Sequence, residues 1–157
     1  MSKETPHLDH DDSEDLLHLD QQLCFALYST LLGVNKVYRG LLRELDLTYP
    51  QYLVMLVLWE QDGLKVTDIC ERLYLETTTL TPLLKRLESR GLLHRRRSAQ
   101  DERQVIVTLS EEGRALRQKA GELPKCMAEA MGCSAKEVAD LRQRLNQIRA
   151  SLFKLAE

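Results

Sequence analysis

The apolar residues of this 157-residue chain recur every three or four positions in two long segments, one near each end. The first segment runs from Asp15 to Leu45, and the second from Ser134 to Leu155. This spacing puts the apolar side chains on one face of a helix. The pattern therefore predicts a helix of about thirty residues over the first segment, and a last helix that begins at the capping box Ser134–Glu137. Neither stripe can be buried within so small a chain, so we expect both helices to help form a homodimer.

The middle of the chain holds three shorter helical segments. Residues 51–60 are apolar nearly all round, which predicts a central buried helix. A short helix from the cap Thr67 to Leu73 follows and, after a tight turn, a second helix over residues 77–89. Gly91 comes directly after this second helix, where glycine readily adopts the positive φ of a helix end.

Beyond Gly91 the pattern changes to that of strands. Residues 92–97 and 104–109 flank a polar turn bordered by arginines, and together they predict a β-hairpin. A helix from Ser110 to about residue 131, interrupted near Pro124, precedes the last one. Two short helices followed by a hairpin are typical of a winged helix-turn-helix. The predicted fold class is therefore mainly α, a winged helix-turn-helix with N- and C-terminal dimerisation helices.

These elements predict the domain organisation. Residues 1–14 are expected to be a disordered acidic N-terminus, and residues 15–157 a single domain. Within the domain, we expect residues 15–63 and 110–157 to be dimerisation and core helices, and residues 64–109 to be the DNA-binding winged helix-turn-helix.

Charge is distributed unevenly along the chain. The net charge is −2, yet residues 1–20 hold one lysine against seven carboxylates, whereas residues 64–109 hold nine basic residues against six acidic ones. A local excess of positive charge suits phosphate, so double-stranded DNA is the expected partner. No apolar run reaches the roughly 18–20 residues of a membrane span. The acidic start also lacks an apolar signal core, so we expect a cytoplasmic protein without membrane association.

Two groups of residues are candidates for contact with DNA. On the second helix, hydroxyl and methyl groups can approach base edges while a lysine reaches phosphate; these residues are Thr77, Thr78, Thr79, Thr81 and Lys85. In the hairpin, guanidinium groups can enter a minor groove or bind phosphate; these residues are Arg95, Arg96, Arg97 and Arg103. Helix capping and a solvated turn are the structural alternatives. A homodimer would place two such units on a pseudo-palindromic operator.

The chain has four cysteines, Cys24, Cys70, Cys126 and Cys133. No two have C-x-x-C spacing and no histidines cluster with them, so we expect neither a metal site nor a cofactor. In a reducing compartment they should be thiols, and any disulfide among them would be regulatory. Cys24 lies near the start of the first long helix, where a thiolate is favoured. The alternative is that Cys24 is an ordinary core cysteine, which is also what we expect of Cys70.

Three short motifs are shared with a known family. They are Gly91-Leu92-Leu93, the hairpin Asp101-Glu102-Arg103 and the helix start Leu109-Ser110-Glu111-Glu112-Gly113-Arg114. With these motifs the chain resembles the MarR family of dimeric repressors over nearly its whole length, which makes residues 15–157 a MarR-type domain. The resemblance implies that Asp101 and Arg103 brace the wing, and that Arg103 also points toward the DNA.

Within this family the sequence is similar to the organic hydroperoxide resistance regulators. The similarity lies in residues 20–28, 38–40, 47–52 and 80–87. It implies a DNA-binding transcriptional repressor whose inducer, an organic hydroperoxide, oxidises Cys24 and thereby releases operator DNA. It also implies that two tyrosines from the dimer partner, which match Tyr38 and Tyr49, hydrogen-bond the reactive thiolate.

Some members of that branch join the oxidised cysteine to a second cysteine of the partner chain. Cys133 and Cys126 are the two candidates here. Cys133 lies in the expected turn before the last helix, and a turn residue can move farther without unravelling a helix. We therefore expect Cys133 to be the partner thiol, with Cys126 as the alternative.

The spacing on the first helix bears on this mechanism. Cys24 and Tyr38 are fourteen residues apart, about 21 Å at ~1.5 Å per residue, so they can meet only between two copies of the chain. Two other functions fit part of the sequence: a MarR-type repressor gated by a small aromatic ligand, and a thiol-dependent peroxide-reducing enzyme. The enzyme would leave the basic hairpin without a role, so we expect a regulator with no catalytic residues.

Overall fold

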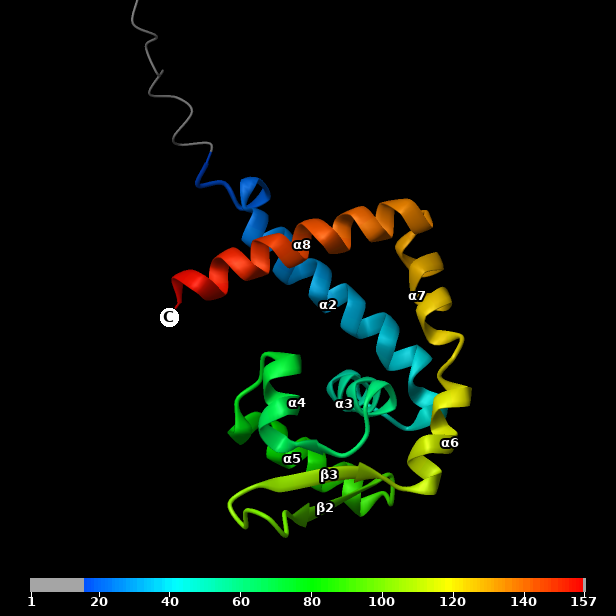
Figure 1. The fold of residues 1–157 in the computed structure, drawn as a ribbon. Coiled ribbons are helices and arrows are strands. Elements are labelled where there is room, and N and C mark those ends of the chain that lie inside the picture. The colour runs from blue at the N-terminus through cyan, green and yellow to red at the C-terminus, as the bar shows by residue number, and fades with distance from the viewer. Residues whose placement is uncertain (1–15, 157) are drawn as a thin grey trace, which may run out of the picture. The chain divides into compact units, whose positions relative to one another are not determined.

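The computed structural model describes residues 16–156 (Figure 1). The chain divides into two compact units, with the boundary between Lys36 and Val37. The elements are η1 (Leu19–Gln21), α2 (Leu23–Leu41), η2 (Arg43–Leu45), α3 (Tyr49–Glu60), β1 (Leu64–Lys65), α4 (Val66–Leu73), α5 (Thr77–Ser89), β2 (Leu93–Arg97), β3 (Val105–Leu109), α6 (Glu111–Lys119), α7 (Leu123–Met131) and α8 (Ala135–Leu155). The predicted disorder of residues 1–14 lies outside the described residues.

The first unit contains η1 and most of α2. The predicted helix of about thirty residues is wrong in its extent, because α2 has 19 residues and begins at Leu23. Gln22 takes extended backbone angles and its N–H closes a 3-10 turn on the Leu19 carbonyl, which separates η1 from α2. After Leu41 the chain tightens into η2, and Asp46 then adopts the left-handed region with φ 50°.

Helix α3 forms the centre of the second unit, and Figure 1 shows α4 and α5 on one side of it and α6 on another. A capping box starts it: the Thr48 side chain accepts from the Gln51 N–H, and the Gln51 side chain accepts from the Thr48 N–H. Six of its residues are buried, namely Gln51, Tyr52, Val54, Met55, Val57 and Leu58. The prediction of a central buried helix is confirmed.

Helices α4 and α5 form the helix-turn-helix. The turn begins at Tyr74, which adopts φ 55°, and α5 has the predicted bounds, with four leucines buried. Thr67 is not the cap of α4, as the sequence had suggested, because α4 begins one residue earlier. The Asp68 carboxylate instead accepts the Lys65 N–H at 3.2 Å and satisfies a backbone donor at the start of the helix.

Three antiparallel strands form the wing, in the order β1-β3-β2. The predicted hairpin is present, with Leu93 opposite Leu109 and Arg97 opposite Val105. The sequence did not indicate β1, since two residues are too short to show an alternating pattern. With this sheet in place, the predicted winged helix-turn-helix is confirmed.

Helices α6, α7 and α8 complete the second unit. Ser110 caps α6 through the Gly113 N–H, and the chain breaks at Ala120–Glu122 before Pro124 enters the first turn of α7. The capping box of Ser134 and Glu137 starts α8 as predicted. No residue of α8 is buried within the single chain. Its exposed apolar side chains include Leu141, Leu145, Leu152 and Phe153.

Gly113 lets α6 approach both the wing and α3. The Trp59 side chain donates to the Gly113 carbonyl at 2.8 Å. A Cβ on Gly113 would lie 2.0 Å from the Leu92 carbonyl oxygen, so the backbone would have to move to admit it.

We expect Gly113→Ala to lower the free energy of unfolding by about 2 kcal/mol or more, because this contact is with backbone rather than with a flexible side chain. Thermal melting checks the prediction. Gly40→Ala in α2 is the matched control, because nothing lies within 4 Å of a Cβ added there. A Gly113→Ala protein that melts like the Gly40→Ala protein would contradict the account.

Candidate functional site

The start of α5 presents the predicted base-reading side chains. Thr77, Thr78, Thr79 and Lys85 are exposed, and Thr81 is half-buried. The N-cap residue of α5 is Glu76, so the threonines lie within the helix and do not cap it. Threonine is a poor helix former, and exposed hydroxyl and methyl groups here suit contact with base edges.

The four arginines of the wing differ in their surroundings. Arg95 is half-buried against α5: its backbone N–H donates to one Glu88 oxygen at 2.7 Å, and its guanidinium to the other at 3.3 Å. The backbone hydrogen bond from Arg95, followed by the bond from its side chain, lowers the pKa of Glu88. Arg96 and Arg97 are exposed. The structure thus uses Arg95 to hold the wing against the recognition helix and leaves Arg96 and Arg97 accessible.

The wing turn is ordered by its own polar groups. The Asp101 carboxylate accepts the Arg103 N–H at 3.1 Å and lies 3.5 Å from the Arg103 Nε. The Ser98 hydroxyl accepts backbone N–H groups from Gln100 and Asp101. Asp101 and Arg103 are therefore brought together as predicted, while the Arg103 side chain remains 94% exposed.

Asp62 joins the end of α3 to the wing, a role that the sequence did not indicate. One of its oxygens accepts N–H groups from Gly63 and Leu109, each at 2.8 Å, and the other accepts from the Arg114 side chain at 3.1 Å. Burial alone would raise the pKa of Asp62, but hydrogen bonds from Leu109 and Arg114 outweigh it and hold that pKa below its ordinary value. The Asp62-Gly63 pair had indicated only the end of a helix.

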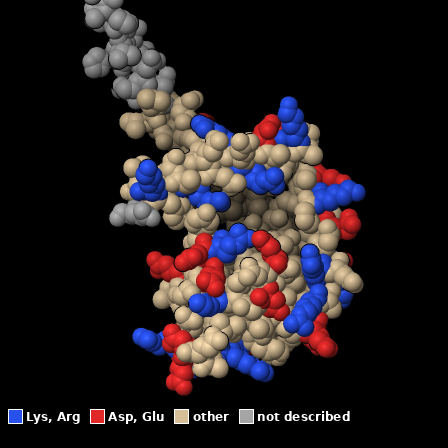
Figure 2. Space-filling model, viewed as in Figure 1, with Lys and Arg blue, Asp and Glu red and all other residues tan. Residues whose placement is uncertain are grey.

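Basic and acidic side chains are interspersed over the face of the molecule in Figure 2. A mixed surface of this kind does not by itself attract nucleic acid. The exposed cations at the helix and wing include Lys85, Arg96 and Arg103, which were predicted to bind phosphate.

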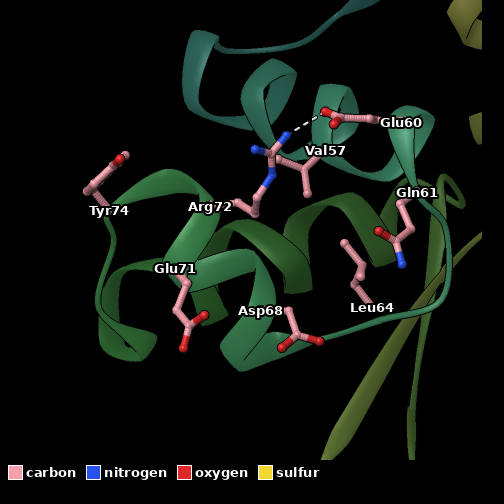
Figure 3. Close-up of a pocket in the computed structure, with 8 residues that line it drawn as sticks. All are labelled: Val57, Glu60, Gln61, Leu64, Asp68, Glu71, Arg72 and Tyr74. Atoms are coloured by element: carbon pink, nitrogen blue, oxygen red, sulfur yellow. Dashed lines mark hydrogen bonds and ion pairs between the residues drawn. The ribbon is translucent and has the colours of Figure 1, made fainter. Parts of the chain in front are cut away.

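A cavity of about 450 Å³ lies between α3 and α4. Its lining residues are Val57, Glu60, Gln61, Leu64, Asp68, Glu71, Arg72 and Tyr74 (Figure 3). The only guanidinium among them, that of Arg72, points to Glu60 and pairs with it at 2.5 Å. Two further carboxylates remain in the lining, which makes this cavity unsuited to an anion such as an aromatic acid.

Three tyrosines cluster where α2 ends and α3 begins. The rings of Tyr38 and Tyr49 are 4.4 Å apart and nearly parallel, and Tyr52 lies 5.8 Å from Tyr38. Burial, with a smaller effect of the phenols of Tyr49 and Tyr52, raises the pKa of Tyr38 to about 12. Burial also raises the pKa of Tyr49 and of Tyr52. At neutral pH these phenols are protonated, so each carries an O–H that can donate to an anion.

The structure brings together the predicted pair Tyr38 and Tyr49 and adds Tyr52. The sequence did not indicate a role for Tyr52, although its place three residues after Tyr49 puts both on one helix face. Tyr52 is 2% exposed and its ring is 6.3 Å from that of Trp59. The cluster is therefore anchored in the core of the second unit.

All four cysteines are free thiols. Cys24 is the second residue of α2 and is exposed. Within the single chain it is therefore not a core cysteine, which was the alternative interpretation. Cys126 is half-buried in α7. Cys133, also half-buried, lies between Gly132, which has φ 67°, and the α8 cap Ser134. Cys70 is half-buried and packs against the core, with its sulfur 3.8 Å from the Thr77 hydroxyl.

Among residues 16–156, no group of three or more His, Cys, Asp or Glu side chains is arranged to hold a metal ion. None of the helices described is at once long enough and apolar enough to cross a membrane.

Known proteins resemble this chain over most of its length. The family model described as transcriptional regulator SarA/Rot matches residues 36–120. The organic hydroperoxide resistance transcriptional regulator of Bacillus subtilis (strain 168) is 43% identical over 143 residues, which cover 91% of this chain and 92% of that protein.

Among solved structures, those of AbfR of Staphylococcus epidermidis are similar to this chain. Reduced AbfR bound to DNA matches with a TM-score of 0.78 and 31% identity, covering 92% of this chain and 99% of that one. Disulfide-formed AbfR matches with a TM-score of 0.62 and 30% identity, covering 94% and 98%.

The different surroundings of Arg95 and Arg96 predict different effects on DNA binding. Arg96→Ala should reduce the slope of log affinity against log salt by about one for each Arg96 lost, because an accessible phosphate contact is removed. Arg95→Ala should lower the melting temperature and leave this slope nearly unchanged, and Glu88→Ala should behave like Arg95→Ala. Binding titrations at several salt concentrations check this. An equal loss of slope in both arginine variants would show that Arg95 also binds phosphate.

The raised pKa of Tyr38 predicts how the protein responds to alkali. Because the folded state favours the neutral phenol, its stabilising contribution is complete below pH 10 and is lost as pH rises toward 12. A titration followed by tyrosinate absorbance should show a component near pH 12 that Tyr38→Phe removes. Tyr28→Phe, which removes an exposed tyrosine, is the control. A high-pH component that persists in full in Tyr38→Phe would contradict the assignment.

Proposed function

The chain belongs to the MarR family of transcriptional regulators, in the branch of the organic hydroperoxide resistance regulators, and we propose a function on this basis. The proposed function is that of a repressor whose Cys24 senses organic hydroperoxides. The reduced protein binds its operator, and oxidation of Cys24 releases it. The observation that carries the proposal is an exposed thiol in the first turn of α2 in a chain that also holds a cluster of protonated phenols.

The chemistry at Cys24 is a nucleophilic displacement. The thiolate attacks the terminal oxygen of the hydroperoxide, so an S–O bond forms as the O–O bond breaks. The sulfur is oxidised to a sulfenic acid, and the peroxide is reduced to an alkoxide that takes up a proton and leaves as the alcohol. A helix N-terminus and phenolic O–H groups both stabilise negative charge on the attacking sulfur.

A homodimer supplies the phenols. Cys24 and Tyr38 lie fourteen residues apart on one helix, about 21 Å along its axis, so Tyr38 and Tyr49 must reach the thiol from the partner. The exposed apolar side chains of α8 support a dimer, since Leu141, Leu145 and Leu152 are 43–59% exposed in one chain. An apolar stripe of this length is typical of a helix that packs against another copy.

The second step forms a disulfide. A thiol of the partner attacks the sulfenic sulfur of Cys24, the S–S bond replaces the S–O bond, and water leaves. We assign this thiol to Cys133, whose position between the glycine that ends α7 and the cap of α8 lets it move without breaking a helix. Cys126, inside α7, would have to unwind its own helix to move as far. AbfR, which resembles this chain, is known in a disulfide-formed state.

Release of DNA follows from geometry. The two recognition helices of a dimer read half-sites about 34 Å apart, and a disulfide requires Cα atoms within ~7 Å. Where the reduced dimer holds Cys133 of one chain farther than this from Cys24 of the other, the disulfide moves α7 and α8, and with them the spacing of the two winged domains. Each release consumes one peroxide per cysteine, so the role of the thiol is stoichiometric sensing and not turnover.

Cys24→Ser is expected to bind operator DNA like the wild type when reduced, and to remain bound after cumene hydroperoxide is added. The reason is that a hydroxyl cannot take up the peroxide oxygen. Fluorescence anisotropy with labelled DNA measures both states, and Cys70→Ser is the control because it removes a thiol beside the recognition helix without removing the sensor.

Mass spectrometry of the oxidised dimer identifies the second thiol. The expected product is a peptide pair that joins Cys24 to Cys133, absent from Cys133→Ser and retained in Cys126→Ser. A Cys24–Cys126 pair would reject the choice of Cys133 but keep the sensing function. Release of DNA from Cys24→Ser by peroxide would reject the function itself. In that case release by aromatic acids, without thiol oxidation, is the alternative to test.

A further inference from the structure

We propose that Arg90 is the positioning residue that makes the recognition helix follow the tyrosine cluster. Its side chain ties the end of α5 to the turn that precedes Tyr49, so a rearrangement at the phenols is carried to the DNA-binding surface. The inference rests on the proposed function, because it concerns how oxidation of Cys24 reduces DNA affinity.

The guanidinium of Arg90 makes three contacts with one turn of the chain. Its two terminal nitrogens donate to the backbone carbonyls of Asp46 and Leu45, the latter at 3.1 Å. Its Nε lies 3.6 Å from the Asp46 carboxylate. The partners are 44 and 45 residues away in sequence, so this is a tertiary contact between two elements.

The turn is built to receive a multiple donor. It is the end of η2, where Asp46 adopts φ 50° and ψ 45°. The last carbonyls of a helical segment accept no hydrogen bond from within that segment, so they are free to accept one from a side chain. The Asp46 carboxylate is 89% exposed, so its ion pair with Arg90 contributes little to the stability of this contact. The two carbonyl bonds define the geometry, because a planar guanidinium can engage both at once.

From this turn to the phenols is a short and rigid path. Leu45 and Leu47 on either side of Asp46 are buried, and the Leu47 N–H bonds back to the Leu42 carbonyl at 3.3 Å. Thr48 then caps α3, and Tyr49 is the first residue of that helix, stacked on Tyr38. A displacement of Tyr49 is therefore passed to the backbone of Leu45 and Asp46, to which Arg90 donates its hydrogen bonds.

The other end of the contact is the junction of recognition helix and wing. Arg90 is the C-cap of α5, and its N–H bonds to the Arg86 carbonyl. Gly91 follows with φ 72°, and β2 begins two residues later. The Leu92 N–H bonds to the Leu87 carbonyl at 3.1 Å, which fixes the wing to the same helix end. Arg90 thus adds a direct side-chain link from the recognition helix and the wing to the phenol-bearing segment, beside the packing of α5 on α3.

The competing explanation is that Arg90 only stabilises the fold. A stabilising role would alter the affinities of the reduced and oxidised proteins together and leave their ratio unchanged. A coupling role alters the ratio itself. The ratio of the dissociation constant of the oxidised dimer to that of the reduced dimer is therefore the quantity to measure.

The experiment compares the full-length wild type with Arg90→Ala, Arg90→Lys and Arg86→Ala. The probe is a duplex selected from random sequence by the reduced wild type, and the oxidant is cumene hydroperoxide. We expect Arg90→Ala to reduce the ratio about tenfold, with Cys24 oxidised at the wild-type rate as followed by mass spectrometry. Arg90→Lys, a single point charge, should fall between. Arg86→Ala removes an exposed charge one turn earlier on the same helix, and its ratio should match the wild type even if both affinities fall.

Two outcomes separate this inference from the proposed function. If the wild type is released on oxidation and the Arg90→Ala ratio is equal to that of the wild type, Arg90 does not couple the two sites and only this inference fails. If oxidised wild type keeps its DNA, the proposed function fails. Should Arg90→Ala not fold by circular dichroism, Arg90→Lys carries the comparison, and a wild-type ratio in that variant at lowered melting temperature overturns the inference.

Discussion

The burial of α3 fixes the positions of the functional elements in the second unit. Half of its twelve residues are buried, and the helix contacts α4, α5 and α6. Truncating one buried leucine or methionine in such a helix costs about 2–5 kcal/mol, a large part of the ~5–15 kcal/mol that stabilises a typical domain. Because α3 packs against three other helices, the residues at one of its ends are held in a defined relation to those at the other.

The two ends of α3 contact different functional elements. At its start, Thr48 caps the helix and Tyr49 stacks on Tyr38, in the cluster that the proposed function brings to the thiol of a second chain. At its end, Trp59 bonds to α6 and Asp62 receives the last residue of β3, so the wing is attached there. Arg90 connects the starting end to the recognition helix as well. Phenols and DNA-contacting elements thus share one core, which gives a local oxidation a route to a distant surface.

Local signals in the sequence were enough for much of this arrangement. The serine caps, the apolar stripe of α5 and the positive-φ Gly91 each act within a few residues, so the helix-turn-helix, the hairpin and the start of α8 were all predicted. The helix predicted at the start of the chain was too long. Its apolar stripe continues through η1 and does not reveal the extended backbone of Gln22, which interrupts the helix.

Features that depend on distant partners were not visible in the sequence. Arg95 was grouped with the DNA-contacting arginines, but its pairing with Glu88 arises only when the wing folds back on α5. The bonds from Leu109 and Arg114 to Asp62 likewise join residues about fifty positions apart. The thiol and tyrosine assignments came from the resemblance to the peroxide-sensing branch, since no spacing within one chain brings Cys24 to Tyr38.

In the proposed mechanism, oxidation of one cysteine controls binding of DNA. The most direct measurement adds cumene hydroperoxide in sub-stoichiometric steps to the DNA-bound dimer, and records at each step both the bound DNA and the fraction of Cys24 that remains a thiol. We expect DNA to be lost in proportion to the fraction of Cys24 modified, and to be fully lost by one equivalent of peroxide per cysteine. DNA that is released while Cys24 remains reduced, or retained after Cys24 is fully oxidised, would contradict this mechanism.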